Sequence, residues 1–119
     1  MGSSSQQVDA RRKPSGYVVS HSDYGQLDYR PQTNSRLTFT NVETVDIYFV
    51  DLNLEDYAKC YDYVIITGAA STKICQHQNA SSFLQTWRSF NASSGFSVSI
   101  QFYSDNTGEY KGFLFQYKG

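Results

Sequence analysis

The strongest constraint on the fold is a strict alternation of apolar and polar side chains near the end of the chain. Every second residue of 96–102 is apolar, and serine or glutamine stands between the apolar residues. A period of two is typical of a strand with one buried face. The pattern returns in 113–117, and the intervening Asn106-Thr107-Gly108 is a turn signal. We therefore predict two half-buried strands that pair as a hairpin across this turn.

Earlier segments repeat this signal at short intervals. Residues 37–40 alternate, 45–50 place Val45, Ile47 and Phe49 on one face, and 63–67 form an apolar run that Gly68 closes. The ten tyrosines and eight phenylalanines also favour strands over helices. Several short strands separated by turn signals predict an all-β fold, an antiparallel sandwich of two sheets.

The chain is long enough for one domain and too short for two. Its 119 residues carry a formal net charge of −1, which provides no broad basic surface for nucleic acid or an anionic membrane. No apolar run is long enough to span a bilayer. Residues 1–15 are polar, begin like an expression tag and carry the only basic run, so we expect a disordered leader followed by a domain over 16–119.

Two cysteines and two glycosylation sequons bear on the cellular compartment. Cys60 and Cys75 enclose a short segment, and a disulfide between them would stabilise the fold by about 3 kcal/mol. The alternative is a pair of free buried thiols. Asn79 and Asn91 each begin an Asn-Ala-Ser sequon in a polar connecting stretch. Together these features favour a secreted, extracellular glycoprotein.

One segment departs from the strand pattern. Phe83, Leu84, Trp87 and Phe90 recur at helical spacing, which predicts a short amphipathic helix over 82–91 packed on the sandwich. An exposed Trp87 in this segment would be a candidate anchor for a protein or sugar partner.

Acidic side chains gather where the predicted strands end. Glu55 follows the strand that carries Asp51 and Asn53, while Asp62 precedes the next strand and Asp105 begins a turn. Converging carboxylates repel one another unless a cation neutralises them. Calcium prefers six to eight oxygen ligands, mostly carboxylates, carbonyls and water. The pattern therefore indicates a candidate calcium site, although the acids could equally be the solvated rim of a sandwich.

Three groups of residues, taken in order, resemble a known family. The first is the start Gly16-Tyr17-Val18-Val19-Ser20, with Tyr24 and Tyr29 following. The second is Glu55, then Cys60, the aromatic-Asp pair Tyr61-Asp62 and a Val-rich strand. The third is Phe102-Tyr103-Ser104-Asp105, followed by Gly112-Phe113. The chain resembles a CUB domain over residues 16–118, which implies a CUB-type jelly roll of two stacked sheets.

The resemblance also implies a ligand set and its support. In calcium-binding CUB domains one Glu, two Asp and oxygens just after the second Asp hold the ion, while an early tyrosine hydrogen-bonds the Glu. The matching positions here are the metal ligands Glu55, Asp62, Asp105, Asn106 and Thr107, with Tyr29 as support.

This chain departs from the family pattern at three places. Only Tyr61 separates Cys60 from Asp62, one residue fewer than usual. Gly108 stands where the family has a ligand asparagine, so Asn106 or water must compensate. The family's first cysteine pair is absent.

For function, the resemblance implies an extracellular, calcium-dependent protein-binding module. A lysine of the partner protein would dock against Glu55, Asp62 and Asp105, whose carboxylates the ion orders. The alternative is a secreted carbohydrate- or glycosaminoglycan-binding protein similar to the spermadhesins, in which Trp87 and tyrosines stack on sugars without calcium. We expect no enzyme, because the only histidines are His21 and His77 and no nucleophile elbow, zinc motif or phosphate loop is present.

Overall fold

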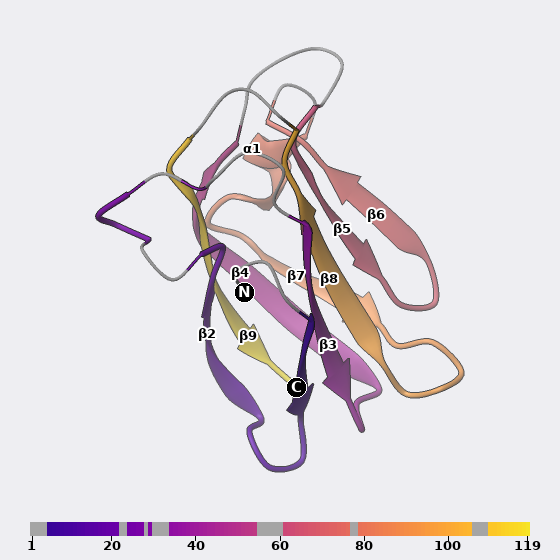
Figure 1. Ribbon diagram of the computed structural model, residues 1–119. Helices are drawn as coiled ribbons and strands as arrows, with labels where there is room; N and C mark the ends of the chain where they lie inside the picture. Colours follow the sequence, from indigo (N-terminus) through magenta and orange to yellow (C-terminus); the bar gives the residue numbers. More distant parts are fainter. Residues whose placement is uncertain are drawn as a thin grey trace.

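The computed structural model describes residues 5–21, 24–27, 29, 34–54, 61–76, 79–105 and 110–119, and these form a sandwich of two sheets (Figure 1). One sheet has the strand order β1-β3-β8-β5-β6, and the other has the order β2-β9-β4-β7. All strand pairs are antiparallel except the parallel pair of β1 and β3. The elements are β1 (Ser5–Asp9), β2 (Ser15–Val19), β3 (Asn34–Thr40), β4 (Thr44–Asn53), β5 (Tyr63–Thr67), β6 (Ser71–Ile74), α1 (Ala80–Phe83), β7 (Trp87–Asn91), β8 (Val98–Tyr103) and β9 (Gly112–Lys118).

The core lies between the sheets and is built by the predicted alternation. Alternate side chains are buried along β8, along β9 from Phe113 and along β4 up to Phe49, after which an irregularity shifts the register of β4; this confirms the expected faces of these strands and the antiparallel sandwich. The Phe102 and Phe113 rings meet edge to face across the sheets, with ring centroids 5.2 Å apart. The core side chains of these three strands are Val45, Ile47, Phe49, Leu52, Val98, Ile100, Phe102, Phe113, Phe115 and Tyr117.

The predicted hairpin between the last two strands was wrong. β8 pairs with β3 and β5, whereas β9 pairs with β2 and β4 in the opposite sheet. Each strand does have a buried face, but the two faces meet across the core rather than lying side by side. The alternation identifies which face of a strand is buried, but it does not determine which strands are its hydrogen-bonded neighbours. Phe96 is also outside the strand: its φ is 56° and its side chain is 57% exposed.

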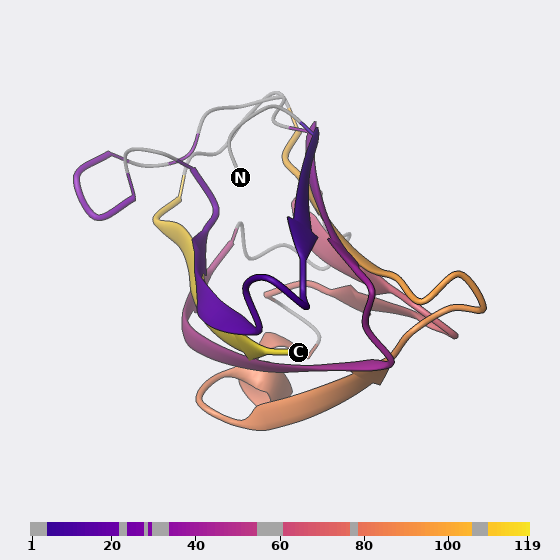
Figure 2. The same ribbon diagram turned by 90° about the horizontal axis from the view of Figure 1, so that it is seen from below.

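The predicted helix over 82–91 was wrong, because its second half is a strand. Only Ala80–Phe83 is helical, and Trp87–Asn91 forms β7 on the open edge of β4 (Figure 2). A helix of this length is marginal in water, whereas pairing with β4 satisfies the backbone. Phe83 and Phe90 still stack at 6.5 Å between centroids, one from α1 and one from β7. The helical spacing of the apolar residues therefore arises from a turn followed by a strand.

The prediction of a disordered leader was wrong for the described residues 5–15. Ser5–Asp9 forms β1, which pairs with β3 from Ser5↔Arg36 to Asp9↔Thr40. Ala10 is buried, and Val8 packs against the core. An open strand edge can pair with a polar segment because the bonds come from backbone groups, which any sequence supplies. No helix in the described part of the chain is long and apolar enough to cross a membrane.

Candidate functional site

The register of β5 and β8 brings two of the predicted acidic residues together. Tyr63 of β5 lies opposite Tyr103 of β8, so the residue before β5 and those after β8 are neighbours at the same end of the sandwich. These residues are Asp62 and Asp105. The peptide N–H of Asp105 donates to Oδ1 of Asp62 at 2.9 Å.

Asp62 is a fully buried carboxylate with two hydrogen-bond donors in the described structure. The hydroxyl of Tyr29 donates to its second oxygen, Oδ2. Tyr29 is itself fully buried and meets the Phe102 ring edge to face at 5.0 Å. The carboxylate is thus held from both sides, by a core tyrosine and by a backbone group of the segment that follows β8.

Burial sets the electrostatics of this carboxylate. Loss of hydration raises the pKa of Asp62, the hydrogen bonds from Tyr29 and from the Asp105 N–H lower it, and the neighbouring Asp105 carboxyl raises it again, with a net upward shift. An anion of this kind is held at a cost in free energy. A cation bound at its free lone pairs would offset that cost.

The residues present are suited to calcium, which takes oxygen ligands and favours carboxylates. Of the predicted ligands, Asp62 and Asp105 lie next to each other at this end of the sandwich. Glu55, Asn106 and Thr107 lie outside the described residues. Among the residues that are described, no group of three His, Cys, Asp or Glu side chains could hold a metal. The Tyr29 hydroxyl donates to Asp62, and the hydrogen bond to Glu55 that the resemblance implies lies outside the described residues.

A second set of contacts ties the segment before Tyr29 to the sheets. Ser20, which is fully buried, accepts the peptide N–H of Phe113 at 3.2 Å, and its Oγ lies 2.6 Å from Nδ1 of His21. Nε2 of His21 lies 2.6 Å from the carbonyl oxygen of Leu27. The sequence analysis named Ser20 only as part of a family motif and did not predict its burial, since a serine that ends an apolar run gives no local sign of it.

Tyr24 and Asp51 complete this support. The Tyr24 hydroxyl donates to Oδ2 of Asp51 at 2.5 Å, and Nζ of Lys111 lies 3.2 Å from the same oxygen. The hydrogen bond from Tyr24 lowers the pKa of Asp51 against a smaller effect of burial, and Lys111 lowers it further. Asp51 therefore serves as an anchor for the Tyr24 segment.

Trp87 does not join the acidic residues. It lies on the four-stranded sheet, 41% exposed, with its ring 5.3 Å from that of Tyr48 between centroids. Nζ of Lys118 lies 4.6 Å from the centroid of the Trp87 ring. The predicted partner-binding residues therefore fall on two separate surfaces.

The predicted disulfide and glycosylation residues are described in part. Cys75 is fully buried and no described cysteine is free, while Cys60 lies outside the described residues. The side-chain amide of Asn79 is engaged at both ends: it accepts from the Cys75 N–H at 3.0 Å and donates to the Lys73 carbonyl at 2.9 Å. Asn91 is exposed, and its Oδ1 accepts from the Thr44 hydroxyl at 3.3 Å.

The fold is thus that of a small β-sandwich module, mostly antiparallel, with the buried carboxylate of Asp62 and the neighbouring Asp105 at one end. The family model of the CUB domain matches residues 7–117, and the chain belongs to this family. The match begins within β1, in agreement with the pairing of that strand. The comparison with curated proteins gave no match.

Solved structures agree with the family assignment. The CUB1-EGF-CUB2 domains of rat MASP-1 superpose with a TM-score of 0.72 at 23% identity, covering 96% of this chain and 42% of that one. The full extracellular region of zebrafish Gpr126/Adgrg6 gives 0.67 at 24% identity, covering 96% of this chain and 14% of that one. The MASP-1 CUB2 domain bound to Ca2+ gives 0.69 at 22% identity, covering 96% of this chain and 97% of that one. This chain thus spans less than half of the first two proteins.

Proposed function

We propose that this chain is an extracellular, calcium-dependent protein-binding module. Glu55, Asp62 and Asp105 would hold Ca2+, with oxygens of Asn106 and Thr107 completing the site. The observation that carries the proposal is the fully buried Asp62 carboxylate, which shares the sandwich end with a second acid. A family neighbour whose solved structure is described as bound to Ca2+ adds fold-level support.

Each described residue has a distinct part in this mechanism. The Tyr29 hydroxyl and the Asp105 N–H orient the Asp62 carboxylate before any ligand arrives. Calcium supplies the positive charge that offsets the repulsion between the acids. A lysine ammonium of the partner then meets carboxylate oxygens that are already fixed, so little side-chain entropy is lost on docking.

Calorimetric titration with CaCl2, with MgCl2 as the control ion, tests the metal site. We expect binding in the range of about 0.1–1 mM, typical of extracellular modules, and its loss in Asp105→Ala. Lysine docking is tested separately by NMR titration with N-acetyl-lysine-methylamide in calcium, against the norleucine analogue, which lacks the ammonium. Equal shifts with the two compounds would contradict lysine recognition while leaving the calcium site in place.

A second candidate function, carbohydrate binding without calcium, is favoured by one observation. The cross-strand register aligns Trp87 with Tyr48, Tyr48 with Gln116 and Gln116 with Tyr17. Because alternate side chains of a strand share a face, the row runs across all four strands on the face opposite the core. Tyr17 is 65% exposed and Trp87 41% exposed. The aromatic rings of this row could stack on sugar rings, and the side-chain amide of Gln116 could hydrogen-bond sugar hydroxyls.

A glycan array probed with and without a calcium chelator separates the two functions. Binding that survives the chelator and is lost in Trp87→Ala would support the sugar surface. Phe96→Ala is the matched control, since Phe96 is also exposed but belongs to a turn outside the row. Binding that disappears in the chelator, or equally in both variants, would count against it.

An extracellular binding module would be secreted, and secretion has consequences for the cysteines and the sequons. Secretion would allow a Cys60–Cys75 disulfide and glycans at Asn79 and Asn91. Intact mass before and after reduction and alkylation tests the disulfide, and peptide mapping of material from a secretory host tests the glycans. We expect Asn91 to be the better tolerated glycan site, because the Asn79 amide is engaged at both ends.

A further inference from the structure

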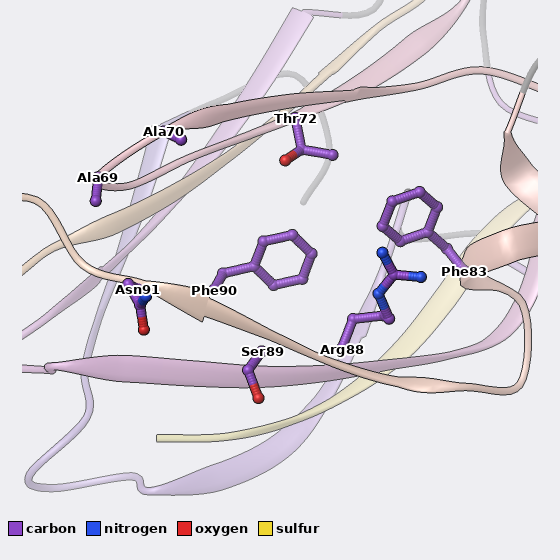
Figure 3. A pocket seen from close by; sticks show the side chains of 8 residues that line it. All are labelled: Ala69, Ala70, Thr72, Phe83, Arg88, Ser89, Phe90 and Asn91. Atoms are coloured by element: carbon purple, nitrogen blue, oxygen red, sulfur yellow. The ribbon is translucent and has the colours of Figure 1, made fainter.

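A cavity of about 260 Å³ lies where the two sheets end side by side, away from the acidic residues. β6 is the last strand of one sheet and β7 the last strand of the other. Figure 3 shows the side chains of Arg88 and Phe90, both of β7, on the side that faces the β5–β6 hairpin. The cavity is lined by Ala69, Ala70, Thr72, Phe83, Arg88, Ser89, Phe90 and Asn91.

Backbone contacts close one end of this cavity. The peptide N–H of Ala69 donates to the carbonyl oxygen of Asn91 at 2.9 Å, which joins the hairpin turn to β7. A Cβ on Gly68 would lie 2.1 Å from that same oxygen, so only glycine allows this approach. The small side chains of Ala69 and Ala70 then leave the space above Phe90 open.

Among the described residues that line the cavity, Arg88 is the only charged one. Its guanidinium lies over the Phe83 ring, with Cζ 4.6 Å from the ring centroid, and Nη1 donates to the carbonyl oxygen of Ser82 at 3.2 Å. Figure 3 shows the guanidinium directed toward the space between Phe83 and Phe90. Arg88 is exposed to solvent, and the stacking contact and one hydrogen bond hold its guanidinium beside the cavity.

This guanidinium has no carboxylate partner within the described residues. The ion pairs found there join Arg12 to Asp9 and Lys111 to Asp51, and neither involves Arg88. The single hydrogen bond to Ser82 leaves further N–H donors of the planar fork available. A planar fork with available donors matches a carboxylate, which can accept two parallel hydrogen bonds.

We propose that this cavity is a binding site for a carboxylate-bearing ligand with a small apolar body. The carboxylate would pair with Arg88, and the apolar part would rest on the half-buried ring of Phe90, which stacks on the buried Phe83 ring at an interplanar angle of 16°. The Thr72 hydroxyl is at hand for a further polar contact. The carboxylate can belong to a free acid or to an acidic side chain of a peptide.

NMR titration of the labelled chain in calcium-depleted buffer tests the site. The first probe is phenylacetate, with neutral phenylacetamide as its control. The second is N-acetyl-glutamate-methylamide capped at its backbone carboxyl, with the glutamine analogue as its control. We expect saturable shifts at Thr72, Phe90 and the Arg88 side chain with at least one acid, and none with either neutral control. Which acid binds more tightly identifies the source of the carboxylate.

Two variants and a matched control make the test decisive. Arg88→Gln should weaken carboxylate binding by about 10-fold or more, the effect of losing charge-assisted hydrogen bonds. Ala70→Leu, which fills the cavity without changing charge, should abolish binding. Arg36→Gln should leave binding unchanged, because Arg36 lies on β3 and hydrogen-bonds Gln101 instead.

Three results would overturn the proposal. The first is the absence of saturable shifts with both acids, and the second is equal shifts with an acid and its neutral control. The third is a loss of carboxylate binding in Arg36→Gln as large as the loss in Arg88→Gln. Ala70→Leu keeps the test valid if Arg88→Gln does not fold. Calcium titrations of the same variants should be unaffected, so failure here is distinct from failure of the metal site.

Discussion

Replacing Asp62 with asparagine should stabilise the protein without calcium and remove the stabilisation that calcium gives the wild type. Without the ion, burial raises the pKa of the Asp62 carboxyl, so its folded pKa lies above the unfolded value. Its contribution to stability is then present below the unfolded pKa and is lost as the pH rises through the folded pKa. At pH 7.5 the charged side chain therefore destabilises the ion-free protein, and the neutral amide removes that effect.

The size of each change follows from the geometry. Asparagine retains the acceptor for the Asp105 N–H, and its amide can donate to the Tyr29 hydroxyl, so both contacts survive in the variant. Without calcium, we expect the free energy of unfolding of Asp62→Asn to exceed that of the wild type by about 1–2 kcal/mol, because the variant buries no charge at this position. With 10 mM calcium, the wild type should gain about 1.4–2.7 kcal/mol if the dissociation constant is about 0.1–1 mM. That gain corresponds to about 6–11 °C in Tm.

Thermal unfolding by circular dichroism at pH 7.5 measures both changes. Wild type and Asp62→Asn are compared in calcium-depleted buffer and in 10 mM calcium. Asp46→Asn serves as the control, because Asp46 lies on β4 and bonds the Ser89 hydroxyl at 2.6 Å. The reasoning is refuted if Asp62→Asn melts below the wild type without calcium and still rises with calcium. Asp62 would then be a structural carboxylate rather than a metal ligand.

Two further predictions concern the segment that supports Tyr29. Gly112→Ala should lower the free energy of unfolding, measured in urea, by about 2–4 kcal/mol. The added Cβ would lie 2.1 Å from Oγ of Ser20, and the φ of +93° is itself unfavourable for alanine. Gly25→Ala has a similar φ of +91° but meets nothing within 4 Å, so equal losses would refute the clash. Tyr24→Phe should make stability less sensitive to acid, since Tyr24 lowers the pKa of Asp51. The stabilisation is present above the unfolded pKa and lost as the pH falls through the folded one; urea midpoints from pH 7 to 3 measure it, and unchanged acid sensitivity would contradict it.

Local patterns in the sequence were sufficient for the buried faces of the strands. Val45, Ile47 and Phe49 were placed on one face from a period of two, and all three are buried. The same reasoning failed at 82–91, because a tight turn between Phe83 and Phe90 reproduces helical spacing without a helix. It also failed for β1, whose pairing depends on backbone groups that no residue pattern reveals.

The acidic residues, too, could be predicted from the sequence only in part. The order of motifs along the chain indicated Asp62 and Asp105, and the register of β5 and β8 places them as neighbours. Neither the burial of Asp62 nor the contact from Tyr29 could be inferred from the residues nearby. Arg88 gave no signal at all, since its environment is assembled from α1, β7 and the distant β5–β6 hairpin.

The sequence by itself determined the all-β class, the buried faces of the main strands and the family motifs, because these depend on residues a few positions apart. Tertiary structure alone decided that β8 and β9 face each other across the core, that β1 completes a sheet, and that a cavity opens beside Arg88. The physical reason is that alternation along a strand sets which side is buried, whereas pairing and cavities depend on contacts between distant segments. Such contacts form only when the whole core packs.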